Sequence, residues 1–182
     1  LPQRVSSDLY VMRPRTDRED VGRYHEDLIV CWACIAGEGP AKILKGDMQG
    51  AREAIEWYKR VFGDDYYLEL QRHEVKDPHQ RANRETFPLQ QRANKELIEL
   101  SKEYGIKLVC TNDCHFVDQD NAEAHDHLLC LATGKDLDDP NRMLYSKQAW
   151  FQTRDEMNEI FADVPEAISN PLEILDKVEP SP

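Results

Sequence analysis

Side chains that can bind a metal ion or move a proton follow apolar segments of the chain. Cys34 comes directly after the segment 28–33, and Asp113 and His115 come after the segment 106–111. If these segments are parallel strands, their carboxyl ends meet at one edge of a sheet, where the reactive groups of α/β folds gather. We therefore expect the thiol, the carboxylate and the imidazole to lie within reach of a shared ion.

The pair Asp113 and His115 supports two interpretations. Separated by one residue after a strand, both side chains can point to one side, and carboxylate oxygen and imidazole nitrogen suit Zn, Mn or Fe. Alternatively, Asp113 forms an Asx turn with the local backbone and His115 is merely its neighbour. The spacing leaves both open, because a catalytic metal site usually takes three protein ligands. Gln71 and His73, at the end of another apolar segment, add polar groups to the same edge.

Cys31 and Cys34 form a Cys-x-x-Cys motif. A redox motif of this kind begins a helix, which lowers the pKa of the thiol, whereas here the pair lies in and at the end of an apolar segment. In an extended strand the two side chains point to opposite faces, so we expect Cys31 to be buried and only Cys34 to reach the edge. The odd count of five cysteines argues against a secreted disulfide framework and favours a reducing cytoplasm.

Three short apolar segments, 28–33, 66–71 and 106–111, have the length and composition of buried strands. Helical patterns separate and follow them, at 47–62, up to Tyr104, at 120–132, at 153–161 and from Pro165 onward. Strands that alternate with helices predict a parallel sheet with right-handed crossovers, and hence an α/β fold. Three such units make half of a barrel or one side of an open sheet.

The same patterns predict details of these elements. Turns or loops are expected at 37–40 and 73–88, which are rich in Gly, Pro or polar residues. Apolar stripes at helical spacing are expected to be buried: Leu89, Ala93, Leu97 and Leu100 in one helix, and Ala124, Leu128 and Leu131 in the next. Helix ends are expected at Asp47, at Gly105 and in a capping box formed by Thr153 and Glu156.

The 182 residues carry a formal charge of −12. Such a surface repels phosphate backbones at long range, so contacts with nucleic acid must be local or made by parts outside this chain. No apolar run reaches the roughly 20 residues that span a bilayer, and the first ten residues lack the apolar core of a signal peptide. We expect a cytoplasmic protein without a membrane partner and, since no Met begins the chain, a piece of a longer one. Motifs of serine hydrolases, P-loops and dinucleotide-binding folds are absent.

Several motifs occur in an order that resembles the PHP (polymerase and histidinol phosphatase) domain of bacterial replicative DNA polymerase III alpha subunits. The resemblance extends roughly from Tyr10 to Val178. The motifs are YHEDLI at 24–29, ACIAGE at 33–38, YLELQRH at 67–73, TNDCHF at 111–116 and TGKDLDDP at 133–140.

The resemblance implies a distorted barrel of seven parallel strands with crossover helices. Residues 28–182 would form its C-terminal half, ending near the palm of the polymerase, and residues 1–27 a connector within the domain. It also implies divalent metal ions (Zn, Mn or Mg) at the carboxyl ends of the strands. Cys34 matches the later Cys of the family, and Asp113 and His115 match its final Asp-x-His. The early His-x-His motif and the middle ligands of the family are missing from this chain.

The resemblance further implies a DNA-directed DNA polymerase, a nucleotidyltransferase of bacterial DNA replication whose catalytic carboxylates lie outside this chain. Its partners would be the rest of the polymerase chain, DNA through other domains, and replisome subunits. The metal site would support 3′–5′ exonuclease or pyrophosphate and phosphoester hydrolysis by activating a water. Two alternatives remain: a structural PHP remnant that buttresses the polymerase and binds partner subunits, and a free-standing metal-dependent phosphoesterase. The isolated fragment is expected to be inactive.

Overall fold

Three parallel strands form the sheet of this protein. The computed structural model describes residues 16–32, 35–75 and 81–178. Within them, β1 (Val30–Trp32), β2 (Tyr66–Leu70) and β3 (Lys107–Cys110) pair in the order β1-β2-β3. Trp32 is in register with Leu68, and Leu70 with Cys110. The predicted strands and the α/β class are confirmed, whereas the described residues contain three strands of the expected barrel and do not show its closure.

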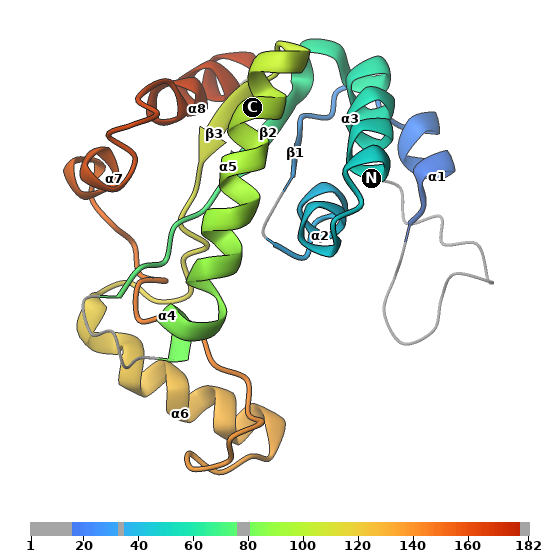
Figure 1. Ribbon diagram of the computed structural model, residues 1–182. Coiled ribbons are helices and arrows are strands. Elements are labelled where there is room, and N and C mark those ends of the chain that lie inside the picture. Colours follow the sequence, from blue (N-terminus) through green and yellow to red (C-terminus); the bar gives the residue numbers. More distant parts are fainter. Residues whose placement is uncertain (1–15, 33–34, 76–80, 179–182) are drawn as a thin grey trace.

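Helices connect and cover these strands (Figure 1). The α-helix α5 crosses in front of the sheet, α3 lies on the side of β1, and α8 lies beside β3, while α6 extends away from the sheet. Among the described helices, none combines the length and the apolar character that crossing a membrane requires. The bounds are α1 (Arg18–Arg23), α2 (Glu38–Lys45), α3 (Met48–Phe62), α4 (Arg81–Glu85), α5 (Phe87–Tyr104), α6 (Ala122–Thr133), α7 (Arg154–Ile160) and α8 (Glu166–Lys177), with 3-10 turns η1 (Gly63–Asp65) and η2 (Gln119–Asn121).

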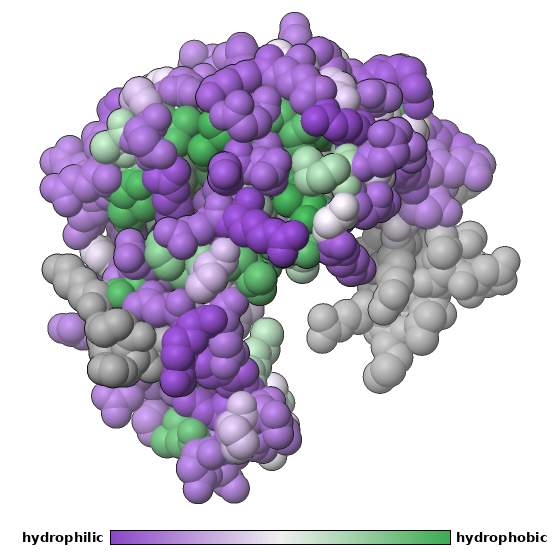
Figure 2. Space-filling view, viewed as in Figure 1, coloured by the Kyte–Doolittle hydropathy of each residue, from purple (hydrophilic) through white to green (hydrophobic). Residues whose placement is uncertain are grey.

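The hydrophobic core joins one face of the sheet to the helices. Alternate residues of β2, namely Tyr66, Leu68 and Leu70, are buried with Ile55 of α3 and Leu97 of α5. Successive residues of a strand point to opposite faces. Tyr67, on the other face, is also buried, and its hydroxyl donates to Glu173 of α8 at 2.8 Å, so helices cover both faces of β2. The surface is mostly hydrophilic, and apolar side chains are seen chiefly in the gaps between the helices (Figure 2).

The predicted helix ends are confirmed. The Asp47 side chain accepts a hydrogen bond from the Gly50 N–H at 2.9 Å and so caps α3. Gly105 ends α5 with a φ of 60°, a left-handed conformation that glycine adopts without a steric cost. Thr153 and Glu156 form the capping box that begins α7.

Two predicted loops were partly wrong, because each contains a helix, whereas residues 73–75 are irregular as expected. Residues 38–45 form α2. The helix tolerates Pro40 because it is the third residue, where a backbone N–H has no helical partner that proline could remove. The region 73–88 contains α4, and Pro88 lies in the first turn of α5 for the same reason.

Two predicted apolar stripes were also wrong, one in part and the other throughout. Leu89 is 40% exposed, and the buried position at the start of α5 belongs to Gln90, which is 2% exposed because its amide is bonded inside the protein. The stripe predicted for α6 was wrong throughout, because Ala124 is exposed as well as Leu128 and Leu131, the latter two at 62% and 82%. Helical spacing places apolar residues on one face but does not ensure that another element covers that face.

The cap at Asp47 can be tested by substitution. Asp47→Ala should lower the free energy of unfolding by about 1 kcal/mol, because the Gly50 N–H loses its acceptor. Asp47→Asn is the matched control, since asparagine is an equally good cap. Urea denaturation measures both, and equal losses for the two variants would refute the capping role.

Candidate metal centre

The loop after β3 is fastened to a distant segment of the chain. Asn112 is buried, and its Nδ2 donates hydrogen bonds to the carbonyl oxygens of Gln148 and Trp150, each at 2.7 Å. The His115 N–H donates to the Ala149 carbonyl at 2.7 Å, and the next residue along the loop pairs with Trp150 in a parallel bridge. The loop that carries Asp113 and His115 therefore has a defined backbone.

The end of β2 fastens the same loop from the other side. His73 is buried, and its Nε2 donates to the Asn112 carbonyl oxygen at 3.0 Å. Its Nδ1 accepts from the side-chain amide of Gln90, also at 3.0 Å, and the Gln90 oxygen accepts from the His73 N–H at 2.9 Å. Burial lowers the pKa of His73 below its ordinary value. Both ring nitrogens are occupied, so His73 positions the loop and is not available as a metal ligand.

Asp113 and His115 come together at this loop. Asp113 has a φ of 47°, and its carboxylate lies 3.9 Å from the His115 Nδ1. Within the described residues, that carboxylate accepts no backbone hydrogen bond, which argues against the Asx turn. The His115 Nδ1 donates to the Asp113 carbonyl oxygen at 2.6 Å, because a carbonyl can only accept. The proton therefore sits on Nδ1 and the lone pair on Nε2, the tautomer of many metal-bound histidines.

Aromatic rings fix the orientation of the His115 side chain. Its ring centroid lies 3.9 Å from that of Tyr145 and 5.7 Å from that of His125. His125 is partly buried on α6, and burial together with the neighbouring His115 lowers its pKa. The contact between the two histidines was not predicted, because it depends on how α6 packs after the loop.

A second polar cluster lies at the ends of β2 and β3. The Thr111 hydroxyl donates to the Glu69 carboxylate, and the Gln71 Nε2 donates to the Thr111 oxygen at 3.2 Å. Burial raises the pKa of Glu69, although these hydrogen bonds oppose the shift. The Gln71 Oε1 is buried and has no hydrogen-bond partner among the described residues. This cluster adds buried polarity beside the loop.

Of the two cysteines in the Cys-x-x-Cys motif, Cys31 lies among the described residues and Cys34 does not. Burial, aided by the charge of Glu69, raises the pKa of the Cys31 thiol to about 11. Cys31 is therefore a protonated, unreactive thiol at neutral pH. Cys34, the third predicted ligand, lies outside the described residues, so its approach to Asp113 and His115 stays a prediction.

The donor atoms of Asp113 and His115 are of the kinds that divalent cations bind, but they are too few for a complete site. One carboxylate and one Nε2 lone pair suit Zn or Mn, and Mg less well because it prefers oxygen. In the described part of the chain, no group of three or more His, Cys, Asp or Glu side chains could hold a metal ion. Asp113 and His115 could therefore hold a cation only together with further ligands.

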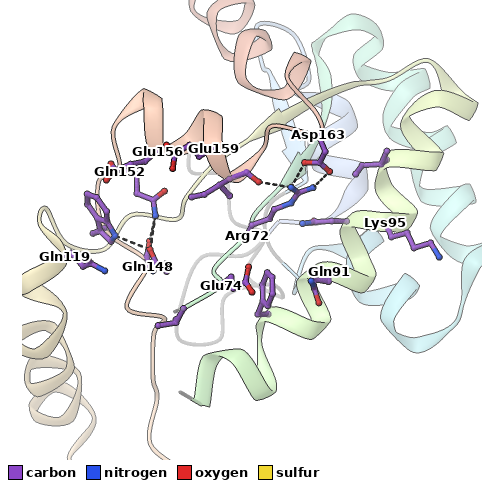
Figure 3. A pocket seen from close by; sticks show the side chains of 16 residues that line it. Arg72, Glu74, Gln91, Lys95, Gln119, Gln148, Gln152, Glu156, Glu159 and Asp163 are labelled. Atoms are coloured by element: carbon purple, nitrogen blue, oxygen red, sulfur yellow. Dashed lines mark hydrogen bonds and ion pairs between the residues drawn. The ribbon is translucent and has the colours of Figure 1, made fainter. Parts of the chain in front are cut away.

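A separate groove of about 960 Å³ lies between α5 and the region of α7 (Figure 3). Arg72 extends into it from the end of β2 and donates to both carboxylate oxygens of Asp163, at 2.6 and 2.9 Å. Neither Asp113 nor His115 lines this groove. Arg72 also donates to the Ile160 carbonyl at 2.8 Å, so it ties the sheet to the connection between α7 and α8.

Comparison with protein families identifies part of the chain. The family model of the PHP domain matches residues 3–73. Residues 3–73 are therefore similar to the PHP domain family. The match ends at His73, so Asp113 and His115 lie beyond it.

DNA polymerase III alpha subunits are similar to this chain along nearly its whole length. The subunit of Borreliella burgdorferi is 37% identical over 171 residues, or 93% of this chain. That of Campylobacter jejuni is 37% identical over 176 residues (90%), and that of Saccharopolyspora erythraea is 33% identical over 182 residues (98%). The predicted resemblance is confirmed. The chain spans 14% of the length of each of these relatives.

The buried imidazole of His73 should make stability depend on pH. Its pKa is lowered in the folded state, so below about pH 6.5 the unfolded chain binds a proton that the folded chain does not. The contribution of His73 is therefore present above that pH and is lost as the pH falls.

Urea denaturation at pH 7.5 and 5.5 measures this dependence. His73→Gln should lower stability at pH 7.5 but reduce the further loss on acidification, whereas the exposed His127→Gln should behave like wild type. An unchanged acid-induced loss in His73→Gln would contradict the assignment.

Proposed function

We propose that the chain is a segment of a bacterial DNA polymerase III alpha subunit and contributes Asp113 and His115 to a divalent metal site. The similarity to these subunits over 90% or more of the chain supports the first part. The His115 tautomer supports the second and is the observation that carries it: Nδ1 donates to the Asp113 carbonyl, and the Nε2 lone pair has no partner among the described residues. The polymerase would act in DNA replication in the cytoplasm, and the rest of its chain, DNA and replisome subunits would be its partners.

The metal site would serve hydrolysis of a phosphodiester or pyrophosphate bond, including 3′–5′ exonuclease activity. A bound cation supplies Lewis acidity and lowers the pKa of a water. Asp113 and His115 would hold the cation, and the Asp113 carbonyl keeps the imidazole in the tautomer that binds. Cys34 is the third ligand that the resemblance assigns. Tyr145 holds the His115 ring in place. The ring therefore loses less conformational entropy when a cation binds.

A structural role is the second candidate. The described residues offer two ligands and no larger cluster, which is what a PHP domain that has lost its metals would retain. In that case the domain would buttress the polymerase and bind other subunits without catalysis. The metal content of the whole polymerase separates the two functions.

Asp113→Asn in the whole polymerase tests the metal site. Loss of one anionic ligand should weaken metal binding by at least ~10-fold and lower any proofreading, while nucleotide addition is spared. Metal analysis after dialysis against a buffered metal gives the occupancy, and a primer-extension assay gives the addition rate.

Asp120→Asn is the matched control, because Asp120 is an exposed carboxylate a few residues away on η2. It should leave the occupancy unchanged. Equal metal content in wild type and Asp113→Asn would exclude Asp113 as a ligand and favour the structural role.

A further inference from the structure

A cavity of about 360 Å³ adjoins the rings that hold His115. It lies between α6 and the chain that follows it, the orange segment at the lower end of Figure 1. Tyr145 and His125 line this cavity and also contact His115, at centroid distances of 3.9 and 5.7 Å. The cavity and the candidate metal ligands therefore share a wall.

The walls of the cavity are suited to a flat, aromatic ligand. His125 has its ring centroid 5.3 Å from that of Phe116 and 5.4 Å from that of Tyr145, so three rings meet at one side. Leu137 and Leu144 add apolar surface. Aromatic and imidazole rings of this kind stack with nucleobases, whichever base is present.

The rim of the cavity carries hydrogen-bonding groups and one positive charge. Lys147 is exposed and forms no ion pair or hydrogen bond with any described residue. The Asp126 carboxylate is already paired with Arg142, at 2.8 Å for one of its two bonds. Glu123 also lines the cavity and adds a negative charge, so Lys147 is the one group of the described lining that attracts an anion. In a chain of formal charge −12, an ammonium without an ion-pair partner among the described residues is a local site for a phosphate beside these rings.

We propose that this cavity binds the base of a terminal nucleotide, with Lys147 facing its phosphate. The inference rests on the proposed function in so far as it places that nucleotide beside Asp113 and His115. Binding itself needs no metal: Phe116, His125 and Tyr145 contact the base, and Lys147 contacts the phosphate. It specifies how a strand end would be held: chiefly through its last base, with Lys147 as the one contact to phosphate, because the acidic surface repels the rest of the backbone.

Photoaffinity labelling of the whole polymerase tests the proposal. The probe is 8-azido-2′-deoxyadenosine 5′-monophosphate, applied in the presence of a chelator so that metal binding is not required. Labelled peptides are mapped by mass spectrometry, and label is expected within 116–147. Unlabelled dAMP should compete at least ~10-fold better than deoxyribose 5-phosphate, because stacking contributes most of the affinity.

Matched variants separate stacking from charge. His125→Ala should reduce the label several-fold and His125→Phe should retain it, since phenylalanine keeps the ring. Lys147→Ala should reduce it, whereas Lys45→Ala, at an exposed lysine of α2, should not. Asp113→Asn should keep the label even if it loses metal, so failure of the metal site and failure of the base site are distinguishable.

Three results would overturn the proposal. The first is the absence of label from 116–147. The second is equal competition by deoxyribose 5-phosphate and dAMP, which would reveal a phosphate site only. The third is an equal loss in His125→Ala and His125→Phe, which would mean that the ring does not stack.

Discussion

The buried side chain of Asn112 is the interaction on which the candidate site depends. Its amide reaches two carbonyl groups of residues 148–150, and its own carbonyl accepts from His73. Three segments that are far apart in the sequence thus meet at one residue. Buried hydrogen bonds of this kind are costly to break, because each group left unpaired loses its solvation without compensation. The left-handed backbone at Asp113 is held by this network, and the side chains of Asp113 and His115 follow from it.

The network can form because the three strands are parallel. Residues 73 and 112 follow β2 and β3 at the same edge, since Leu70 is in register with Cys110. Gln90, at the start of α5, reaches that edge because the helix runs back across the sheet from there. Arg72 adds a further tie, from the end of β2 to Asp163. The sheet therefore determines where the loop lies, and the polar side chains at its edge determine the conformation of the loop.

The parts that sequence predicts well are those encoded locally. Strand segments, the Asp47 cap and the left-handed Gly105 each depend on a few adjacent residues, and each was confirmed. The pairing of Asp113 with His115 was predicted for the same reason, although the tautomer was not. Contacts between distant residues were missed: nothing in the pattern connects Gln90 to His73 or His125 to His115. The exposed leucines of α6 were also missed, because helical periodicity does not specify which element, if any, covers the apolar face of a helix.

The central claim is that this loop presents Asp113 and the Nε2 of His115 to one cation. Anomalous diffraction from crystals of the whole polymerase grown with Zn or Mn tests it most directly. A peak is expected at about 2.0–2.2 Å from both the Asp113 carboxylate and the His115 Nε2, with Nδ1 still bonded to the Asp113 carbonyl. A fully occupied cation that contacts neither side chain would contradict it.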